Sequence, residues 1–482
     1  MSRQTRSGAT YSPLSGLPDA GQLVVAGRWD AEGLFQSAAA TQVACDFTVE
    51  PVDGASVVFR APTPLSDEDL SPAIAGIFDS NAPSHPLPPS TTKHSKACNN
   101  GSKRRRSSRR QAAAQAKQTS TDSISKHAAK PSTLKKHNKL HWIAAAMRVD
   151  ELPHCGRGSW TGKRESKKGL GRSWTVDELR AQGFQIIPYE EGVNKVILDA
   201  EDRIFSGVFA PPEGDWHQVK AEGAECLRAA RRHGLGSGTY SPKELVHRRG
   251  EFLAIPTGVS LEGGQKRPGN LFYNLRGRRI IAQSILRNRA IRRIAGFQSS
   301  IFGFISPKLF RHYCQTFDLL FKRHPELVKN FDNSVFPCAS FNCGPASVAH
   351  EHYDSNNLSF GLCALTPLGN FDYKSGGHLI LFNLKIAFEF PPGSTAIIPS
   401  AAVKHGNTPI QPGEERMSIA QYAAGGLFRW VAYGFQSGKD LVSSRNGQKK
   451  RDLIDKPEEA RWSEGLKLYS TPATLLKDHA CV

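Results

Sequence analysis

The sequence predicts an α+β protein: a jelly-roll or cupin-like barrel of short strands, flanked by helices and preceded by a disordered, basic N-terminal tail. Three observations predict this. Between residues 358 and 423, short apolar runs alternate with Gly- and Pro-containing turns, as in all-β barrels. Helical patterns with recognisable caps lie mostly before that stretch. Residues 1–140 are rich in Ser, Thr, Ala, Pro and Gln and poor in aromatic residues, so they bury too little apolar surface to fold.

Composition and charge divide the 482 residues into four predicted parts. These are a disordered tail (1–140), a mixed helical and strand region that packs on the core (141–335), the catalytic barrel strands (336–435), and a C-terminal helix and tail (436–482). The net charge is +19, and residues 81–140 alone hold 14 Lys and Arg against one acidic residue. Nine cysteines without CxxC spacing indicate a reducing compartment. No apolar run resembles a signal peptide or a membrane span, so no membrane association is expected.

Local signals predict the helices and one hairpin. Helices are expected at 173–183, 221–233, 306–324 and 456–470. The first carries a capping box, Thr175 with Glu178, and the third begins with Ser306 and Pro307. An apolar stripe on the third helix is expected to pack on the barrel rather than form a partner groove; it comprises Leu309, Phe310, Tyr313, Phe317, Leu320 and Phe321. The alternation at 195–210 predicts a hairpin, and the last dozen residues are expected to fray.

The barrel strands are expected at 358–366, 378–390, 394–403 and 416–423. Turn sequences PLGN, KSGG, PPGS and QPGEE separate them. In a final hairpin, His405 and Arg416 would lie on neighbouring antiparallel strands. Phe428 and Trp430 are expected to close the core.

Two short sequences carry candidate site residues. In EHYDSNN, His352 and Asp354 are two apart, so on a strand both side chains point to one face. His405 adds a second imidazole, completing the two-His, one-carboxylate ligand set typical of non-haem Fe(II) oxygenases. Arg416 offers a planar fork suited to the far carboxylate of a 2-oxo acid, and Ser418 shares its strand face.

Simpler interpretations exist for single residues. A His-x-Asp pair alone is common and is usually solvated or hydrogen-bonded, so the prediction depends on the whole combination. His350 shares the strand face of His352 and can be an outer-shell group or a surface residue. His378 follows two glycines and is expected only to open a strand.

The stretch from SNNLSFGLCALTPLGNFDYKSGGH to the end of AAGGLFRWVAYGF resembles a group of fungal, transposon-associated 2-oxoglutarate/Fe(II) dioxygenase-domain proteins grouped with the Tet/JBP-like oxygenases. The resemblance covers roughly residues 180–470. It implies a double-stranded β-helix core, with Fe(II) on His352, Asp354 and His405 and 2-oxoglutarate on Arg416 and, less directly, Ser418. The family pattern has Arg where this chain has Tyr353, a position that points away from the metal on a strand.

The resulting hypothesis is an Fe(II)- and 2-oxoglutarate-dependent dioxygenase that hydroxylates a C–H bond, with a modified nucleic-acid base such as 5-methylcytosine as the first substrate candidate. Two alternatives stay open. One is a prolyl-type protein hydroxylase or a small-molecule hydroxylase. The other is a non-catalytic, transposon-associated DNA-binding protein that uses the barrel as a scaffold.

Basic segments suggest a nucleic-acid partner. Residues 103–110, KRRRSSRR, fit nuclear import or contact with a phosphate backbone, and the alternative is a charge run that keeps the tail soluble. Between Lys266 and Arg293 there are nine Lys and Arg and no acidic residue. This segment fits either a phosphate-binding surface or an amphipathic helix face without a partner. Nuclear localisation is expected, with the cytoplasm as the alternative, and no oligomeric state is predicted.

Overall fold

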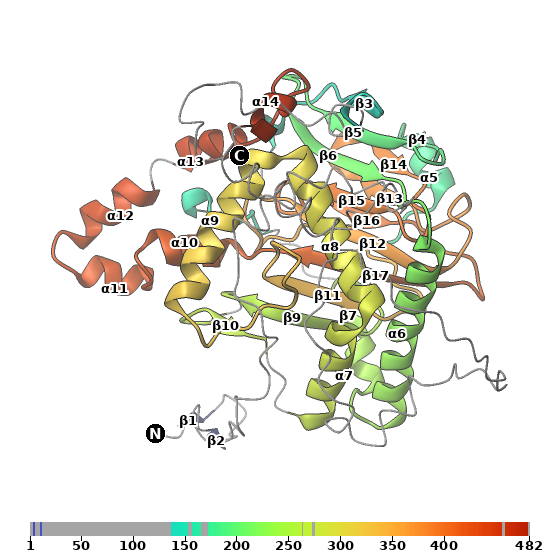
Figure 1. The fold of residues 1–482 in the computed structure, drawn as a ribbon, viewed down its shortest axis with the longest axis horizontal. Coiled ribbons are helices and arrows are strands. Elements are labelled where there is room, and N and C mark those ends of the chain that lie inside the picture. Colours follow the sequence, from blue (N-terminus) through green and yellow to red (C-terminus); the bar gives the residue numbers. More distant parts are fainter. Residues whose placement is uncertain are drawn as a thin grey trace, which may run out of the picture.

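The computed structural model describes residues 3–4, 10–11, 136–152, 157–164, 172–262, 264–271, 275–455 and 458–480. It is a mixed α+β fold built on a nine-stranded and a four-stranded sheet (Figure 1). Most of the predicted tail at 1–140, including the basic run 103–110, lies outside the described residues. Its described parts are a short antiparallel pair, β1 (Arg3–Gln4) with β2 (Thr10–Tyr11), and the residues from 136 onward.

The large sheet has the strand order β10-β9-β11-β17-β12-β15-β6-β5-β3, and every pairing except β3 with β5 is antiparallel. Its strands are β3 (Leu140–Ala144), β5 (Asn194–Leu198), β6 (Ile204–Phe209), β9 (Ala254–Ser260), β10 (Gly269–Asn270), β11 (Cys338–Asn342), β12 (Cys363–Asn370), β15 (Thr395–Ile398) and β17 (Glu415–Tyr422). The predicted hairpin at 195–210 is confirmed as β5 and β6. The strand expected at 358–366 begins later, at Cys363.

The small sheet has the order β16-β13-β14-β4. Its strands are β4 (Gln185–Ile187), β13 (Leu379–Leu381), β14 (Ile386–Phe388) and β16 (His405–Asn407). The single strand expected at 378–390 is wrong, because the 3-10 turn η8 (Phe382–Leu384) and Lys385, with a φ of 51°, reverse the chain between β13 and β14. The outer face of this sheet is covered by α5 (Val176–Ala181), whose Leu179 packs on Ile380 and Ala387.

Helices cover the outer face of the large sheet (Figure 1). They are α6 (Trp216–Gly236), α7 (Arg276–Arg287), α8 (Arg289–Ile305) and α9 (Pro307–Arg323). A buried polar network joins α8 to the strands: Gln298 donates to Thr366 Oγ1 at 2.9 Å, and Gln421 donates to Gln298 Oε1 at 2.8 Å. Because buried amides are costly without partners, this network fixes the position of α8 on the sheet.

The local helix predictions hold. The Thr175–Glu178 capping box is present at the start of α5, and α9 begins at Pro307. The apolar stripe of α9 is buried except for Phe321, which is half-buried against the core. The core interpretation of the stripe is therefore confirmed.

The C-terminal part is more ordered than expected. The predicted barrel region ends with α10 (Gly425–Ala432). The C-terminal part comprises α11 (Gly438–Ser443), α12 (Gly447–Asp455), α13 (Glu458–Leu466) and α14 (Leu475–Ala480), and α11 and α12 stand out from the body in Figure 1. Fraying of the last dozen residues is wrong for α14. Leu475 is fully buried, and His479 Nε2 donates to the Phe304 carbonyl at 2.7 Å. Phe428 and Trp430 are buried on α10, as expected.

Short elements complete the fold: η5 (Val149–Glu151), η6 (Arg157–Ser159), η7 (Pro242–Leu245), β7 (Val246–His247) and β8 (Gly250–Glu251). Within the described ranges, no helix combines the length and apolarity that crossing a membrane requires. Five described cysteines, Cys226, Cys314, Cys338, Cys343 and Cys363, are buried free thiols.

Candidate metal centre

Three predicted ligands converge at one place. One ligand atom each from His352, Asp354 and His405 lie within 4.8 Å of one another. The Nε2 atoms of His352 and His405 lie 3.6 and 3.8 Å from the carboxylate oxygens of Asp354. Both histidines are buried, while the Asp354 side chain is 26% exposed, so the cluster has one open side.

The chain holds these residues by backbone pairing rather than on one continuous strand. His352 and His405 form an isolated antiparallel bridge, and the amide of Asp354 donates to the Ser400 carbonyl at 2.9 Å. The expectation of His352 and Asp354 on adjacent rungs of a strand is wrong, because the chain leaves the bridge directly after His352 and turns. The two side chains nevertheless meet.

Hydrogen bonds define the tautomers of both imidazoles. His352 Nδ1 lies 2.7 Å from the His350 carbonyl, and His405 Nδ1 lies 3.0 Å from the Val403 carbonyl. A carbonyl only accepts, so each Nδ1 carries the hydrogen and each Nε2 carries a lone pair. Both lone pairs are on the atoms nearest Asp354, which is the arrangement a metal ion needs.

The protonation states also fit a divalent cation. Burial, with His405 as a second cause, lowers the pKa of His352 to about 3, so this imidazole is neutral at pH 7. Burial acts to raise the pKa of Asp354, but His352, His405 and Arg249 outweigh it and the net shift is downward. Neutral imidazoles and a charged carboxylate are the forms that ligate metals.

Arg416 is a buried cation with unused hydrogen-bonding capacity. It is 1% exposed, and its Nη1 donates to the Ser347 carbonyl. Its Nε and Nη2 atoms are buried and have no hydrogen-bond partner in the described part of the chain. Burial lowers its pKa to about 10, so it stays charged at pH 7. An unpaired buried charge is expensive, which indicates that an anionic ligand completes this site.

Ser418 lies beside Arg416 on the same face of β17. It is 3% exposed, and its Oγ accepts a hydrogen bond of 2.9 Å from Asn342 Nδ2. The hydroxyl hydrogen is therefore free to be donated elsewhere. Gln421, on the opposite face of β17, bonds to α8, so Arg416 and Ser418 point to the interior between the sheets.

His405 and Arg416 do not lie on neighbouring strands, so that expectation is wrong: β16 belongs to the small sheet and β17 to the large one. Both residues nevertheless border the space between the sheets. His405 pairs with Leu381 of β13, and Gly377, just before β13, lies so close to Arg416 that an added Cβ would be 3.3 Å from its Cδ. Gly377 and Leu381 are four residue steps apart, which is at most about 13 Å of extended chain.

Three residues near the ligands in the sequence, His350, His378 and Tyr353, make different contacts. His350 contributes its carbonyl, which orients His352. His378 directly precedes β13, as expected, and its ring bonds to Thr408. The Tyr353 hydroxyl accepts a hydrogen bond from Asn383, so its side chain points to the η8 turn instead of the cluster.

Two residues near the site were not predicted from the sequence. Arg249 lies in the two-residue turn between β7 and β8, and its carbonyl accepts from the His350 amide at 2.8 Å. Its charge contributes to lowering the pKa values of His352 and Asp354. Asn342 of β11 pairs with Ser418 only because β11 and β17 are neighbours. The sequence Arg-Arg-Gly at 248–250 could have predicted the turn that carries Arg249. No local sequence pattern indicates that Asn342 contacts Ser418.

The basic segment Lys266–Arg293 is partly neutralised within the chain. Arg278 pairs with Glu244, Arg292 with Asp332 and Arg293 with Asp215. The other six have no ion pair with a described residue: Lys266, Arg267, Arg276, Arg279, Arg287 and Arg289. The surface available for phosphate is thus smaller than the sequence suggests.

Comparison with known proteins adds two distant likenesses. No protein-family model matches the sequence, and no curated protein matches it. NgTET1 in complex with 5mC DNA is similar in structure with a TM-score of 0.36 and 13% identity, over 50% of this chain and 83% of that one. An oxidoreductase of the 2OG-Fe(II) oxygenase family from Burkholderia pseudomallei has a TM-score of 0.23 and 16% identity, over 45% and 94%. Both TM-scores lie below 0.5, so neither likeness assigns a function to this chain.

Proposed function

We propose that this protein is an Fe(II)- and 2-oxoglutarate-dependent dioxygenase. The observation that carries the proposal is the buried guanidinium of Arg416, two of whose nitrogen atoms have no hydrogen-bond partner among the described residues, together with the cluster of His352, Asp354 and His405. A metal-binding cluster explains the three ligands, and a dicarboxylate cosubstrate explains the unpaired cation.

In this proposal His352, Asp354 and His405 hold Fe(II). The two imidazoles offer their Nε2 lone pairs because carbonyl groups hold both Nδ1 hydrogens in place. Asp354 supplies the negative charge. When bound, the iron supplies the chemistry that couples oxidation of a C–H bond to C–OH with O2 to decarboxylation of 2-oxoglutarate to succinate and CO2.

Arg416 and Ser418 bind the far carboxylate of 2-oxoglutarate. Arg416 has Nε and Nη2 available for a two-point contact, and the Ser418 hydroxyl has a free hydrogen because Asn342 donates to its oxygen. Burial of both side chains excludes water from this contact and strengthens it.

The strand order supports a double-stranded β-helix as the core. In the order β11-β17-β12-β15 of the large sheet and His352-β16-β13-β14 of the small one, successive strands alternate between the two sheets except at the β13–β14 hairpin, as in a jelly roll. In such a core the two histidines come from one layer and Arg416 from the other.

A modified nucleic-acid base is the proposed substrate. The net charge of +19, the six basic residues of Lys266–Arg293 without ion pairs and the family resemblance of residues 180–470 support it. A base in a duplex would have to be flipped out to reach the cluster. The basic run 103–110 supports nuclear import as the proposed localisation.

The test has two stages. Anaerobic titration of the full chain with Fe(II) and 2-oxoglutarate should give the visible charge-transfer band of a chelated 2-oxo acid, and Arg416→Gln should weaken it. Incubation with O2 and DNA containing 5-methylcytosine, followed by mass spectrometry of the nucleosides, should show oxidised bases and matching succinate.

Each outcome distinguishes between the candidate functions. Absence of metal binding by the intact chain would refute the oxygenase and leave a non-catalytic DNA-binding protein. Succinate without altered bases would keep the oxygenase and reject the base, so that prolyl peptides and free small molecules become the next substrates to assay.

A further inference from the structure

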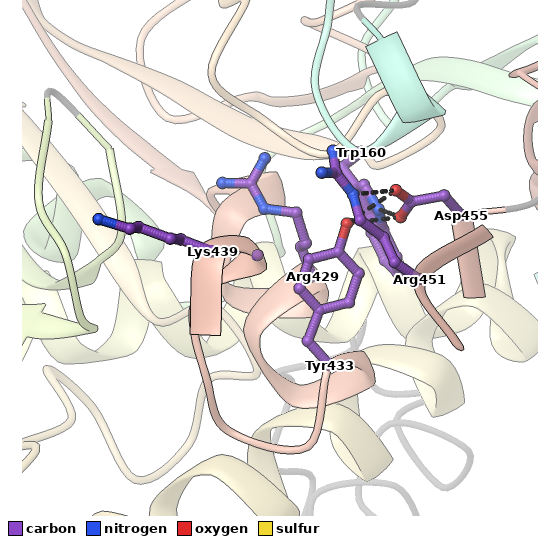
Figure 2. A pocket seen from close by; sticks show the side chains of 7 residues that line it. Trp160, Arg429, Tyr433, Lys439, Arg451 and Asp455 are labelled. Atoms are coloured by element: carbon purple, nitrogen blue, oxygen red, sulfur yellow. Dashed lines mark hydrogen bonds and ion pairs between the residues drawn. The ribbon is translucent and has the colours of Figure 1, made fainter. Parts of the chain in front are cut away.

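A second site lies between α10, α11 and α12, outside the cluster of His352, Asp354 and His405. It is a pocket of about 310 Å³ whose lining comes from four separate segments. The lining residues are Trp160, Arg429, Tyr433, Gly438, Lys439, Arg451 and Asp455 (Figure 2). Three of the seven are basic and one is acidic. A hollow of this size is large enough for a small ligand.

Asp455 connects the segments of the pocket wall, and its hydrogen-bond acceptor sites are all occupied. One of its oxygens accepts from Trp160 Nε1 at 2.9 Å and from the Tyr433 hydroxyl at 2.7 Å. The other accepts from Arg451 Nε at 3.2 Å. These bonds tie the segment after η6, the end of α10 and α12 together. The carboxylate is thus a structural group, and its charge is balanced by Arg451.

Arg429 and Lys439 are the groups available to a ligand. The side chain of neither makes a hydrogen bond or ion pair with a described residue, and no dashed line reaches either in Figure 2. With Arg451 and Asp455 paired, these two residues leave the lining with two uncompensated positive charges. Guanidinium and ammonium groups around one hollow are the donors that phosphate oxygens require.

Arg461 provides an independent indication of a missing anion. Its guanidinium carbon stacks 3.7 Å above the Trp160 ring, which itself lines the pocket. Its Nε and Nη2 atoms are buried without a hydrogen-bond partner among the described residues. A third cation therefore lies at the wall of the pocket, with two nitrogen atoms that have no hydrogen-bond partner among the described residues.

The pocket adjoins the loop that follows Asp354. A Cβ at Gly425 would lie 1.8 Å from the Trp160 carbonyl oxygen, and a Cβ at Gly162 would lie 3.2 Å from Ser355 Cα. The Ser359 hydroxyl also donates to the Ser159 carbonyl at 2.6 Å. The segment that carries Trp160 is thus packed directly between the pocket and the residues after Asp354.

The geometry points to a phosphate-binding site in this pocket, with Arg429 and Lys439 as its principal contacts. The phosphate can come from the backbone of a nucleic-acid strand or from a free phosphorylated molecule. The strand is the source we favour, and that choice rests on the proposed function, because a strand held here would pass the loop after Asp354. The phosphate site itself does not depend on the metal.

The test uses the full chain with two charge-removing double variants. R429Q/K439Q removes the two lining cations that make no ion pair with a described residue, and K449Q/K450Q removes the same charge from exposed positions of α12 that do not line the pocket. Binding of tripolyphosphate is measured by calorimetry, and binding of a short DNA strand by fluorescence anisotropy at several salt concentrations. R429K/K439R, which keeps both charges, and the melting temperature of each variant control for misfolding.

For R429Q/K439Q we expect about tenfold weaker binding of both ligands, and for the DNA strand a salt dependence reduced by about 0.7 per lost phosphate contact. K449Q/K450Q should change DNA affinity less than threefold, about the size of a long-range charge effect. Loss of tripolyphosphate binding with unchanged DNA binding would keep the site and assign it to a free phosphorylated molecule. Equal behaviour of the two double variants toward tripolyphosphate would overturn the proposal.

These measurements contain neither iron nor 2-oxoglutarate. A negative result therefore leaves the dioxygenase proposal standing. Conversely, a chain that binds no iron but still loses phosphate affinity on R429Q/K439Q would keep this site and reject the oxygenase.

Discussion

His352 and His405 pair through their backbones in both directions. The amide of His352 donates to the His405 carbonyl at 2.9 Å, and the amide of His405 donates to the His352 carbonyl at 3.0 Å. The pair holds the two rings with centroids 4.3 Å apart. Two imidazoles from distant parts of the sequence are therefore positioned by main-chain bonds, so that ion binding costs little ordering of the backbone.

Removing a ligand should abolish metal binding. His352→Ala, Asp354→Ala and His405→Ala each delete one donor of the cluster, so affinity for Fe(II) or Co(II) should fall by more than the roughly 10–100-fold that outer-shell changes cost. Calorimetry with Co(II) measures this. Tyr353→Phe is the matched control, because Tyr353 lies between two ligands in sequence but points to Asn383. Equal affinities for the alanine variants and the control would refute the ligand assignment.

Arg416→Met should stabilise the protein while destroying cosubstrate binding. Methionine removes a buried charge, two of whose nitrogen atoms make no hydrogen bond within the described chain, so the free energy of unfolding should rise by about 1–2 kcal/mol without ligand. Urea denaturation with and without 2-oxoglutarate measures both effects. The wild-type chain should gain stability from 2-oxoglutarate and the variant should not. A variant that is less stable than the wild type would show that Arg416 has a structural role instead.

His479 should make the protein sensitive to acid. Burial lowers its pKa from 6.5 to about 4, so the unfolded chain binds a proton first as the pH falls below 6.5. The stability contributed by the neutral imidazole is present above pH 6.5 and is lost toward pH 4. His479→Gln keeps a donor for the Phe304 carbonyl but has no proton to gain. Its free energy of unfolding should fall about 1–2 kcal/mol less between pH 6.5 and 5 than that of the wild type.

The same comparison tests the docking of α14. A pH dependence identical in the two proteins would show that His479 is solvated and that α14 does not pack on α8 as the Phe304 contact indicates.

Gly425 should tolerate no side chain. An alanine Cβ there would lie 1.8 Å from the Trp160 carbonyl oxygen, so the chain must shift and the free energy of unfolding should fall by about 2–3 kcal/mol or more. Gly236→Ala is the control. It lies at the end of α6 with nothing within 4 Å of the added Cβ, and should stabilise by up to about 1 kcal/mol. Similar melting temperatures for both variants would refute the close packing of α10 on the segment after η6.

Elements with local causes were predictable. The Thr175–Glu178 capping box is complete within four residues, and Pro307 begins α9 because a proline needs no amide donor there. The single strand expected at 378–390 was wrong because no local sequence signal marks the point where the chain reverses. Its apolar pattern continues through 382–385, but the backbone reverses at Lys385, whose left-handed conformation no sequence rule requires.

The site residues were predictable as a set because metal ligation and carboxylate recognition restrict residue type and spacing. Their arrangement was not. The sequence placed His405 and Arg416 in one hairpin, whereas β16 and β17 belong to opposite sheets. A turn sequence shows that the chain reverses but does not show which strand it pairs with next.

The sequence alone determined the chemical inventory of the candidate centre: two imidazoles, a carboxylate and a guanidinium, with capped helices around short strands. Only the tertiary structure decided that β17 lies between β11 and β12, that Asn342 meets Ser418, and that Arg429 and Lys439 border one pocket. The physical reason is the range of the interactions. Caps and turns are satisfied by atoms a few residues apart, whereas sheet order and pockets depend on burying apolar faces contributed by the whole chain.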